Sequence, residues 1–505
     1  MEKIAVVLID TYSAKLIIAG SKKQDTYEIL DRETEQINLG LEQEDYFLKK
    51  PQIDDCIRVF KDFRKICDMY ETKKIIAIAN FDEDTKPKNI YSFFDEVFAT
   101  CGFRFTMLTD NEQNNYIYMG VINTYDMPKG TVVSLTSNSL HLVEYNRRNV
   151  VNSVAMHFGP VTLLRMYPIA ELGVKTAFQK MEKYIETQLS DAAWIGEMEE
   201  EFSLIGSGMG FTDLSKMIRK FIKYPLDKDD CFVANFEDTE KIYEQLKTLD
   251  ISASKRLKGI DEPRADIFVA SLAIIMGIFK ASKRNQINIV ERGFAEGLIL
   301  AEFVPTTFEK PISDVLGFGI SNNLVDLEQI DLEHNEQVYN LSILLFKQLR
   351  VLHKLPRGYV KILRIASVLY NVGKRINNIN FSKYSYDVIL GLDIFGADHR
   401  EQVLAAFVAS LAEGAEISLT EWVKYKSMFS EEDFDAIKKL GVIVALASSF
   451  DKTKDAQVVD INCDILGDSV IMKTVTVSNA DYLIRQALNY QKEFEKNFHK
   501  KLEIL

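Results

Sequence analysis

The feature that most constrains the fold is a pair of short hydrophobic hairpins that resemble each other, Ile4–Gly20 and Thr131–Tyr145. In each, an apolar run typical of a β-strand stops at a tight polar turn and resumes as a second apolar run. Such a turn can hold a phosphate group. Because the hairpins lie far apart in the sequence, each is predicted to open its own α/β domain, with a ligand site in the cleft between the domains.

The composition is typical of a cytoplasmic protein. At 505 residues, 47% of them hydrophobic, the chain is long enough for several domains. No apolar run approaches the roughly 20 residues of a membrane span, and the N-terminus has no cleavable signal pattern. The net charge of −13 argues against nucleic-acid binding, which relies on many Lys and Arg side chains. We therefore expect neither a membrane nor a nucleic acid as a partner.

Other segments support a resemblance to a known family. Glu112 stands between the hairpins in L-T-D-N-E-Q-N-N-Y-I-Y-M-G-V, and further matches are G-S-G at Gly206–Gly208, G-I-D-E-P-R-A-D at Gly259–Asp266 and E-G-L-I-L at Glu296–Leu300. Together with the hairpins, these motifs resemble those of the Ppx/GppA family of exopolyphosphatases and guanosine pentaphosphate phosphohydrolases. The matches extend over most of residues 1–303.

The resemblance implies an α/β fold of two actin-like ATPase (ribonuclease H-like) domains with a central cleft, predicted at residues 1–124 and 125–303. The first of these is expected to run β-β-α-β-α. An all-helical HD-like domain is predicted at residues 304–452, because apolar residues recur there at helical spacing. A small C-terminal α/β domain follows at residues 453–505, in which two strands precede a helix predicted over Ala480–Lys500. The resemblance also implies a homodimer.

The resemblance assigns roles to individual residues. Hydrolysis of a phosphoanhydride needs positioned phosphates, usually Mg²⁺, and a carboxylate that orients or deprotonates water. Glu112 stands where the family has its general base, and Asp10 is a weak candidate for a metal ligand. The candidate phosphate-binding or ligand-binding residues are Asp10, Ser13, Lys15, Ser137, Asn138, Ser139, His141, Gly206, Ser207 and Gly208.

Several positions around these residues depart from the family pattern. Tyr12 replaces a glycine of the first turn, and Asn115 replaces an arginine that follows the general base. Asp82 also replaces an arginine, which reverses the charge. In the second hairpin, Ser134 and His141 replace an aspartate and a glutamate, and neither supplies the negative charge that Mg²⁺ favours.

The helical region departs in the same way from an active HD phosphohydrolase. His334 matches the first metal ligand of such a domain, but Tyr370-Asn371 stands where the His-Asp pair is expected. One histidine is too few for a metal centre. His334 is therefore predicted to lie at a helix start or on the surface.

Three hypotheses about function remain open. In the first, which the substitutions favour, the site is degenerate and the protein is weakly active or inactive, binding polyphosphate or a phosphorylated guanosine nucleotide in the cleft. In the second, it is an active exopolyphosphatase or pppGpp phosphohydrolase with Glu112 as base and Mg²⁺ as cofactor. In the third, it is a non-catalytic dimeric scaffold that needs no cofactor. Each lost charge typically costs ~2–4 kcal/mol of transition-state stabilisation.

Overall fold

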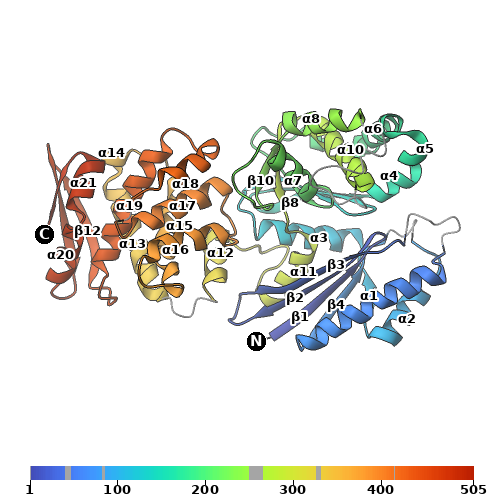
Figure 1. The fold of residues 1–505 in the computed structure, drawn as a ribbon, viewed down its shortest axis with the longest axis horizontal. Helices are drawn as coiled ribbons and strands as arrows, with labels where there is room; N and C mark the ends of the chain where they lie inside the picture. Colours follow the sequence, from blue (N-terminus) through green and yellow to red (C-terminus); the bar gives the residue numbers. More distant parts are fainter. Residues whose placement is uncertain (1, 40–46, 82–85, 249–264, 326–330, 415) are drawn as a thin grey trace. The chain divides into compact units, whose positions relative to one another are not determined.

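The computed structural model describes residues 2–39, 47–81, 86–248, 265–325, 331–414 and 416–505 (Figure 1). The chain divides into two compact units, Met1–Val315 and Leu316–Leu505. We call them unit 1 and unit 2. Asp82 and the first six residues of the Gly259–Asp266 motif lie outside the described residues. The finer division into four domains stays a prediction.

Unit 1 contains a first sheet, sheet A, in which the first hairpin pairs with neighbouring strands. Its order is β3-β2-β1-β4-β5, with β1, β2 and β3 antiparallel and β4 and β5 parallel to β1. Figure 1 shows α1 and α2 packed along this sheet. The strands are β1 (Glu2–Ile9), β2 (Ser13–Ser21), β3 (Glu28–Gln36), β4 (Lys74–Ala79) and β5 (Phe105–Met107), and the helices are α1 (Lys50–Met69) and α2 (Ile90–Cys101).

The second hairpin begins sheet B, which repeats the same arrangement. Its order is β10-β11-β9-β6-β7-β8: β6, β7 and β8 are antiparallel, and β9 and β11 run parallel to β6. The strands are β6 (Lys129–Leu135), β7 (Leu140–Asn146), β8 (Asn149–Met156), β9 (Ser203–Gly208), β10 (Phe232–Asn235) and β11 (Gln286–Val290). The predicted duplication is therefore present, and in both halves a third antiparallel strand, β3 or β8, follows the hairpin. The pattern β-β-α-β-α was wrong in omitting β3 and β5.

One face of sheet B is covered by a helical layer with a large apolar core. Its helices are α4 (Pro160–Met166), α5 (Ile169–Leu172), α6 (Val174–Leu189), η1 (Ser190–Gly196), α7 (Phe211–Phe221), α8 (Phe236–Lys247) and α10 (Ala265–Ser282). Helix α10 has a mean hydropathy of 1.7 and is, among the described residues, the one helix long and apolar enough to cross a membrane. Because 78% of α10 is buried inside the fold, it has the environment of a core helix.

Two further helices, α3 (Asp110–Ile122) and α11 (Phe294–Phe303), cross each other at unusually close range. A Cβ atom on Gly120 would lie 1.9 Å from the backbone O of Gly293, and one on Gly297 would lie 1.9 Å from the backbone O of Tyr116. Helix α3 also packs on sheet B through Ile117, and α11 begins directly after β11. The crossing therefore fixes the start of α11 against the C-terminal half of α3.

Unit 2 is a helical bundle with a small sheet. Its sheet has the order β12-β13-β14, in which β12 and β13 are antiparallel and β14 is parallel to β13. The elements are α12 (Val315–Leu324), α13 (Leu332–Gln348), α14 (Arg350–His353), α15 (Tyr359–Leu369), η3 (Val372–Arg375), α16 (Phe381–Gly391), α17 (His399–Leu411), α18 (Leu419–Lys424), η4 (Lys426–Met428), α19 (Asp433–Phe450), β12 (Val458–Ile465), β13 (Ser469–Thr476), α20 (Asp481–Leu488), α21 (Gln491–Phe498) and β14 (Lys501–Ile504).

The single helix predicted over Ala480–Lys500 was wrong. The chain forms two short helices, α20 and α21, that separate at Asn489 and Tyr490. At His499 the backbone enters the left-handed region with φ +56°, which ends α21 and lets the chain return as β14.

Candidate functional site

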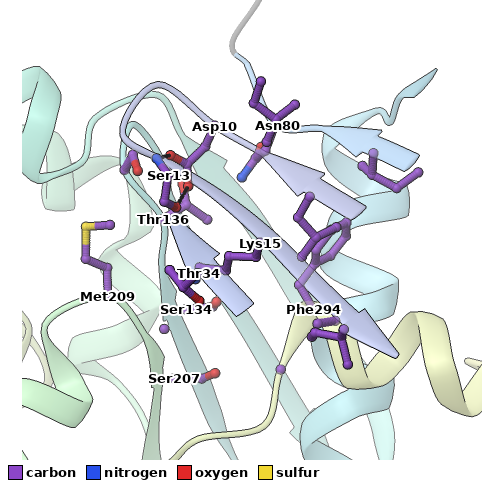
Figure 2. Close-up of a pocket in the computed structure, with 18 of the residues that line it drawn as sticks. Asp10, Ser13, Lys15, Thr34, Asn80, Ser134, Thr136, Ser207, Met209 and Phe294 are labelled. Carbon is purple, nitrogen blue, oxygen red and sulfur yellow. Dashed lines mark hydrogen bonds between the residues drawn. The ribbon is translucent and has the colours of Figure 1, made fainter. Parts of the chain in front are cut away.

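A pocket of about 260 Å³ lies in unit 1 between the two hairpins and the start of α11. Figure 2 shows Asp10 and Ser13 at the first hairpin turn near one end, Lys15 in the middle, and Ser207 and Phe294 toward the other end. Of the predicted ligand-binding residues, the pocket brings together Asp10, Ser13, Lys15, Ser137, Ser207 and Gly208. The remaining candidates, Glu112, Asn138, Ser139, His141 and Gly206, are not part of its lining.

The first hairpin turn is closed by the carboxylate of Asp10. Its Oδ1 accepts hydrogen bonds from the backbone N–H groups of Tyr12 and Ser13, both at 2.7 Å, and its Oδ2 accepts one from the Ser13 hydroxyl at 3.1 Å. The backbone N–H groups of Tyr12 and Ser13 are therefore already bonded within the turn and are not available to a phosphate. Tyr12 itself is buried in the apolar core next to sheet B, so its ring lies outside the pocket lining.

The second hairpin turn offers more donors. Within it, the Thr136 hydroxyl accepts from the backbone N–H of Ser139 at 3.0 Å. The amide of Asn138 donates to the hydroxyl of Thr11 at 2.9 Å, which ties the two hairpin turns together. The hydroxyl of Ser137 is buried and, in the part of the chain that the structure describes, has no hydrogen-bond partner. Because Ser137 also lines the pocket, it is a free polar group beside the space for a ligand.

The charged side chains around the pocket are of both signs. Lys15 is exposed and, among the described residues, makes no ion pair. The second cation is Arg32 from β3, whose Nη2 lies 3.0 Å from Oε1 of Glu296. The carboxylates of the lining are those of Asp10, Glu33, Glu291 and Glu296. The lining is therefore acidic overall, and an anionic ligand depends on the two cations or on a bound metal ion.

Glu112 is occupied in shaping the start of α3. Its Oε2 accepts hydrogen bonds from the backbone N–H and the hydroxyl of Thr109, both at 2.8 Å, and Thr109 accepts in return from the backbone N–H of Glu112. This reciprocal pair is a capping box. The backbone and hydroxyl donors of Thr109 lower the pKa of the Glu112 carboxyl, which makes it a weaker base.

His141 lies in the core and is neutral. Its Nδ1 lies 2.8 Å from the Oδ1 of Asn114 on α3, and only 1% of the residue is exposed. Burial, followed by the nearby charge of His157, lowers the pKa of His141 from 6.5 to about 4. Since the Asn114 oxygen accepts a proton from Nδ1, Nε2 carries the lone pair, and it has no partner among the residues that the structure describes.

The glycine segment Gly206–Gly208 forms the end of β9. A Cβ atom on Gly206 would lie 2.4 Å from the ring of Phe211, so this glycine is required by packing. Gly208 has φ +88° and approaches the backbone O of Leu135, where a Cβ would lie 2.3 Å away. The hydroxyl of Ser207 donates to the backbone O of Arg292 at 2.9 Å. The segment thus shapes the pocket wall mainly through its backbone.

The described residues contain no group of three or more His, Cys, Asp or Glu side chains that could hold a metal ion. Mg²⁺ nevertheless binds commonly through one or two carboxylates together with phosphate oxygens and water. Asp10 meets this requirement in part, because its Oδ2 accepts only the 3.1 Å hydrogen bond from Ser13. The residues present therefore fit a Mg²⁺ ion that arrives with a phosphate ligand.

In unit 2, His334 lies at a helix start, as one of the two predicted placements had it: α13 begins at Leu332, and its N-cap Asp331 accepts a hydrogen bond from the backbone N–H of His334. The alternative, a position on the surface, was wrong. The ring is buried, with Nδ1 2.7 Å from Oδ2 of Asp451 and Nε2 2.7 Å from the hydroxyl of Tyr370. Next to it, the amides of Asn335 and Asn371 bond each other reciprocally at 3.0 and 2.8 Å. Hydrogen-bonded side chains thus fill the positions that correspond to metal ligands in an HD phosphohydrolase.

Some residues of the pocket lining were not among the sequence predictions. Arg32 and Thr34 come from β3, which was not predicted. The two residues are two positions apart, and this spacing could have indicated that they lie on one face of a strand. Asn80 follows β4, and Phe294 begins α11. A polar residue directly after a buried strand is a recognisable signal, since ligand sites in α/β sheets lie at the carboxyl ends of strands.

Two family models match long segments of this chain. The model of the Ppx/GppA phosphatase family matches residues 17–304, and that of Ppx/GppA phosphatase domain III matches residues 321–496.

Two relatives resemble the chain over long alignments. It is 23% identical over 316 residues to a bifunctional 3-dehydroquinate synthase/phosphatase of Fusobacterium nucleatum, covering 59% of this chain and 46% of that protein. It is 22% identical over 356 residues to a guanosine-5'-triphosphate,3'-diphosphate pyrophosphatase of Aeromonas hydrophila, covering 68% of this chain and 66% of that protein. The chain therefore spans less than two thirds of the length of these relatives.

Solved structures show the fold. An exopolyphosphatase from Cytophaga hutchinsonii matches with a TM-score of 0.55 at 17% identity, covering 60% of this chain and 98% of that chain. The Ppx/GppA family member of Aquifex aeolicus matches with a TM-score of 0.50 at 20% identity, covering 60% and 97%. The predicted α/β fold with actin-like domains and a helical C-terminal part is confirmed.

Proposed function

Because this chain belongs to the Ppx/GppA phosphatase family, we propose that its pocket binds the phosphate chain of polyphosphate or of a phosphorylated guanosine nucleotide and hydrolyses it slowly or not at all. The observation that carries the proposal is the engagement of Glu112. Its carboxylate caps α3 through Thr109 and does not line the pocket. A general base has to reach the attacking water directly or through one further water, and its pKa works best near the working pH.

The donors around the pocket support ligand binding. Lys15 is an exposed cation without an ion-pair partner among the described residues, and the Ser137 hydroxyl stands free beside the same space. The backbone N–H of Ser137, which also lines the pocket, makes no backbone–backbone hydrogen bond within the described part of the chain. A lysine, a hydroxyl and a backbone N–H group are typical phosphate ligands.

The loss of charge at two family positions supports slow turnover. Ser134 and His141 lie opposite each other on β6 and β7, and neither side chain carries a negative charge. His141 is neutral because burial lowers its pKa to about 4. Of the positions that the resemblance identifies with metal and catalytic carboxylates in the two hairpins, Asp10 alone retains a carboxylate, and it also closes the first turn. We therefore include Mg²⁺ as a ligand-dependent cofactor held by Asp10 and the phosphates.

A second candidate function is full phosphoanhydride hydrolysis with Glu112 as base. One observation favours it: Glu112 is exposed at the start of α3, and its lowered pKa keeps it ionised at neutral pH. Its carboxylate would have to leave Thr109 for the pocket. The proposal of slow turnover and this candidate differ in one measurable quantity, the rate of phosphate release.

We further propose, from the family resemblance, that the protein is a homodimer in the cytoplasm. The molar mass in solution tests the first part directly: the chain has a mass of 57.7 kDa, so light scattering should give twice this value. A mass of one chain at micromolar concentration would contradict the dimer.

Binding is tested by thermal unfolding with tripolyphosphate, guanosine tetraphosphate, guanosine pentaphosphate and ATP, each with and without Mg²⁺. A ligand that binds the folded state raises the midpoint temperature as its concentration rises. We expect this rise for tripolyphosphate or a guanosine phosphate and a smaller one in Lys15→Gln. Lys65→Gln, an exposed lysine on α1 outside the pocket lining, is the matched control and should behave as the wild type. No shift with any of these ligands would contradict the proposal.

A further inference from the structure

Two cations of the pocket lie on one face of the same pair of strands. Lys15 on β2 pairs with Thr34 on β3, and Ile17 pairs with Arg32. Residues directly opposite each other in an antiparallel pair share a face, and so do residues two apart on a strand. Lys15 and Arg32 are therefore diagonal neighbours, which places their Cα atoms about 7–8 Å apart. All four of these residues line the pocket.

Arg32 is held at one end by Glu296. Nη2 of Arg32 lies 3.0 Å from Oε1 of Glu296, whereas Oε2 of Glu296 accepts the backbone N–H of Gly293 at 3.1 Å. The Glu296 side chain is 5% exposed, and that of Arg32 is 46% exposed. The Glu296 carboxylate thus caps the start of α11 and also orients the guanidinium of Arg32, which comes from sheet A.

The guanidinium has donors left over. In the part of the chain that the structure describes, neither Nε nor Nη1 of Arg32 donates a hydrogen bond. Separating Arg32 from Glu296 would leave a buried carboxylate without its cation, which is strongly unfavourable. Because an arginine has five N–H groups in a fixed plane, Arg32 can remain paired with Glu296 and bind a second anion at the same time.

We propose that Arg32 is a ligand-binding residue of this pocket, that Glu296 positions it, and that Arg32 and Lys15 bind neighbouring phosphates of one chain. This inference rests on the proposed function, since it assumes that the pocket takes phosphates. It adds a specificity: two separated cations favour a ligand with at least two linked phosphates over orthophosphate. The carboxylates of the lining repel any anion, and this repulsion is offset by Lys15 and Arg32. A single phosphate cannot contact both cations, so the acidic lining increases the preference for linked phosphates.

The test measures dissociation constants for tripolyphosphate and orthophosphate by calorimetry at one fixed ionic strength. Arg32→Gln should weaken tripolyphosphate binding at least tenfold and orthophosphate binding about threefold or less. Arg32→Lys keeps the charge but loses the planar fork, and it should fall between the wild type and Arg32→Gln. The matched control is Arg58→Gln, because Arg58 lies on α1, is 73% exposed, pairs with Asp55 and is not part of the pocket lining. This control should leave both constants unchanged.

Positioning by Glu296 is tested with a double-mutant cycle. If Glu296 orients Arg32, the effect of Arg32→Gln on tripolyphosphate binding shrinks to less than threefold in a Glu296→Ala background. An equal effect in both backgrounds would overturn the role of Glu296. Should Glu296→Ala unfold because it removes the cap of α11, Glu296→Gln replaces it in the cycle.

The outcomes distinguish a failure of the role of Arg32 from a failure of phosphate binding by the pocket as a whole. Tripolyphosphate binding by the wild type that Arg32→Gln leaves unchanged overturns this inference and leaves the proposed function standing. No tripolyphosphate or orthophosphate binding by the wild type contradicts the proposed function, and the inference falls with it. If Arg32→Gln does not fold, Arg32→Lys decides: a dissociation constant equal to that of the wild type overturns the inference.

Discussion

Glu112 and Thr109 cap each other at the start of α3: Oε2 of Glu112 lies 2.8 Å from both the backbone N and the hydroxyl of Thr109. The carboxylate at the family's general-base position is therefore part of a helix cap. This arrangement accounts for two properties at once, since it stabilises α3 and keeps the carboxylate away from the pocket lining.

The cap contributes measurably to stability. Thr109→Ala should reduce the free energy of unfolding by about 1 kcal/mol, because it removes the N-cap hydroxyl. Chemical denaturation of unit 1 measures the change. The control is Thr187→Ala in α6, an exposed threonine whose hydroxyl bonds only Lys183 O, and it should change stability by less than about 0.5 kcal/mol. An equal effect of both changes would contradict a capping role for Thr109.

His141 makes stability fall in mildly acidic solution. Its pKa is about 4 in the folded state and near 6.5 in the unfolded chain. Between these values the unfolded chain takes up a proton that the folded state does not, so stability falls as the pH drops from about 6.5 to about 4. His141→Gln should lose this part of the pH dependence. The Nε2 chemical shift of His141 should stay that of a neutral ring at pH 5, and a titration midpoint near 6.5 would contradict the assignment.

The crossing of α3 and α11 tolerates no side chain at its glycines. Gly297→Ala should destabilise unit 1 by about 1–3 kcal/mol or more, because the new Cβ would lie 1.9 Å from the backbone O of Tyr116 and force the helices apart. Gly391→Ala, at the end of α16, meets no atom within 4 Å and should be neutral or slightly stabilising. Thermal unfolding compares the two, and a neutral Gly297→Ala would show that the helices can separate freely.

The ion pair between the buried Asp433 and the partly exposed Arg400 stabilises unit 2. Burial alone would raise the pKa of Asp433, but hydrogen bonds from Tyr359, Arg400 and the backbone of Ser430 lower it. This stability is therefore present above the unfolded-state pKa and is lost as the pH falls through the lower folded-state value. Asp433→Ala should cost about 1–3 kcal/mol at neutral pH, because it leaves the Tyr359 hydroxyl and the Ser430 N–H without their acceptor, while water still solvates part of the Arg400 guanidinium.

The two tryptophans allow unit 2 to be followed separately. Trp194 lies in unit 1 and Trp422 in unit 2, so Trp194→Phe leaves a single fluorescent reporter of unit 2. The control is Asp435→Ala, which removes an exposed carboxylate of α19 that pairs with Lys439. If Asp433→Ala and Asp435→Ala shift the unfolding midpoint reported by Trp422 fluorescence equally, the pair of Asp433 and Arg400 contributes no more to stability than an exposed ion pair.

The sequence predicted the duplicated fold because its signals are local. Each hairpin is an apolar run, a polar turn and another apolar run. In the structure, the two strands of each hairpin pair in antiparallel orientation. Strand β3 was missed because its sequence, E-I-L-D-R-E-T-E-Q, is largely charged and lies at the sheet edge, where packing does not require apolar side chains. Arg32 was missed together with β3.

The candidate site was harder to predict, because it depends on contacts between distant segments. The capping box was visible as Thr109 followed three residues later by Glu112, a recognised helix-start signature. The burial of Tyr12 next to sheet B, and the bond of His334 to Asp451, join residues far apart in the chain. No local pattern reports such pairs, so their roles followed only from the fold.

Whether Glu112 acts in catalysis is measured by the initial rate of phosphate release from long-chain polyphosphate and guanosine pentaphosphate, with Mg²⁺ and with Mn²⁺, in the wild type and in Glu112→Gln. We expect slow release in the wild type and a rate in the variant within about threefold of it, since the Glu112 carboxylate is engaged by Thr109. Rapid turnover by the wild type that falls by about 10² or more in Glu112→Gln would show instead that Glu112 acts as the base.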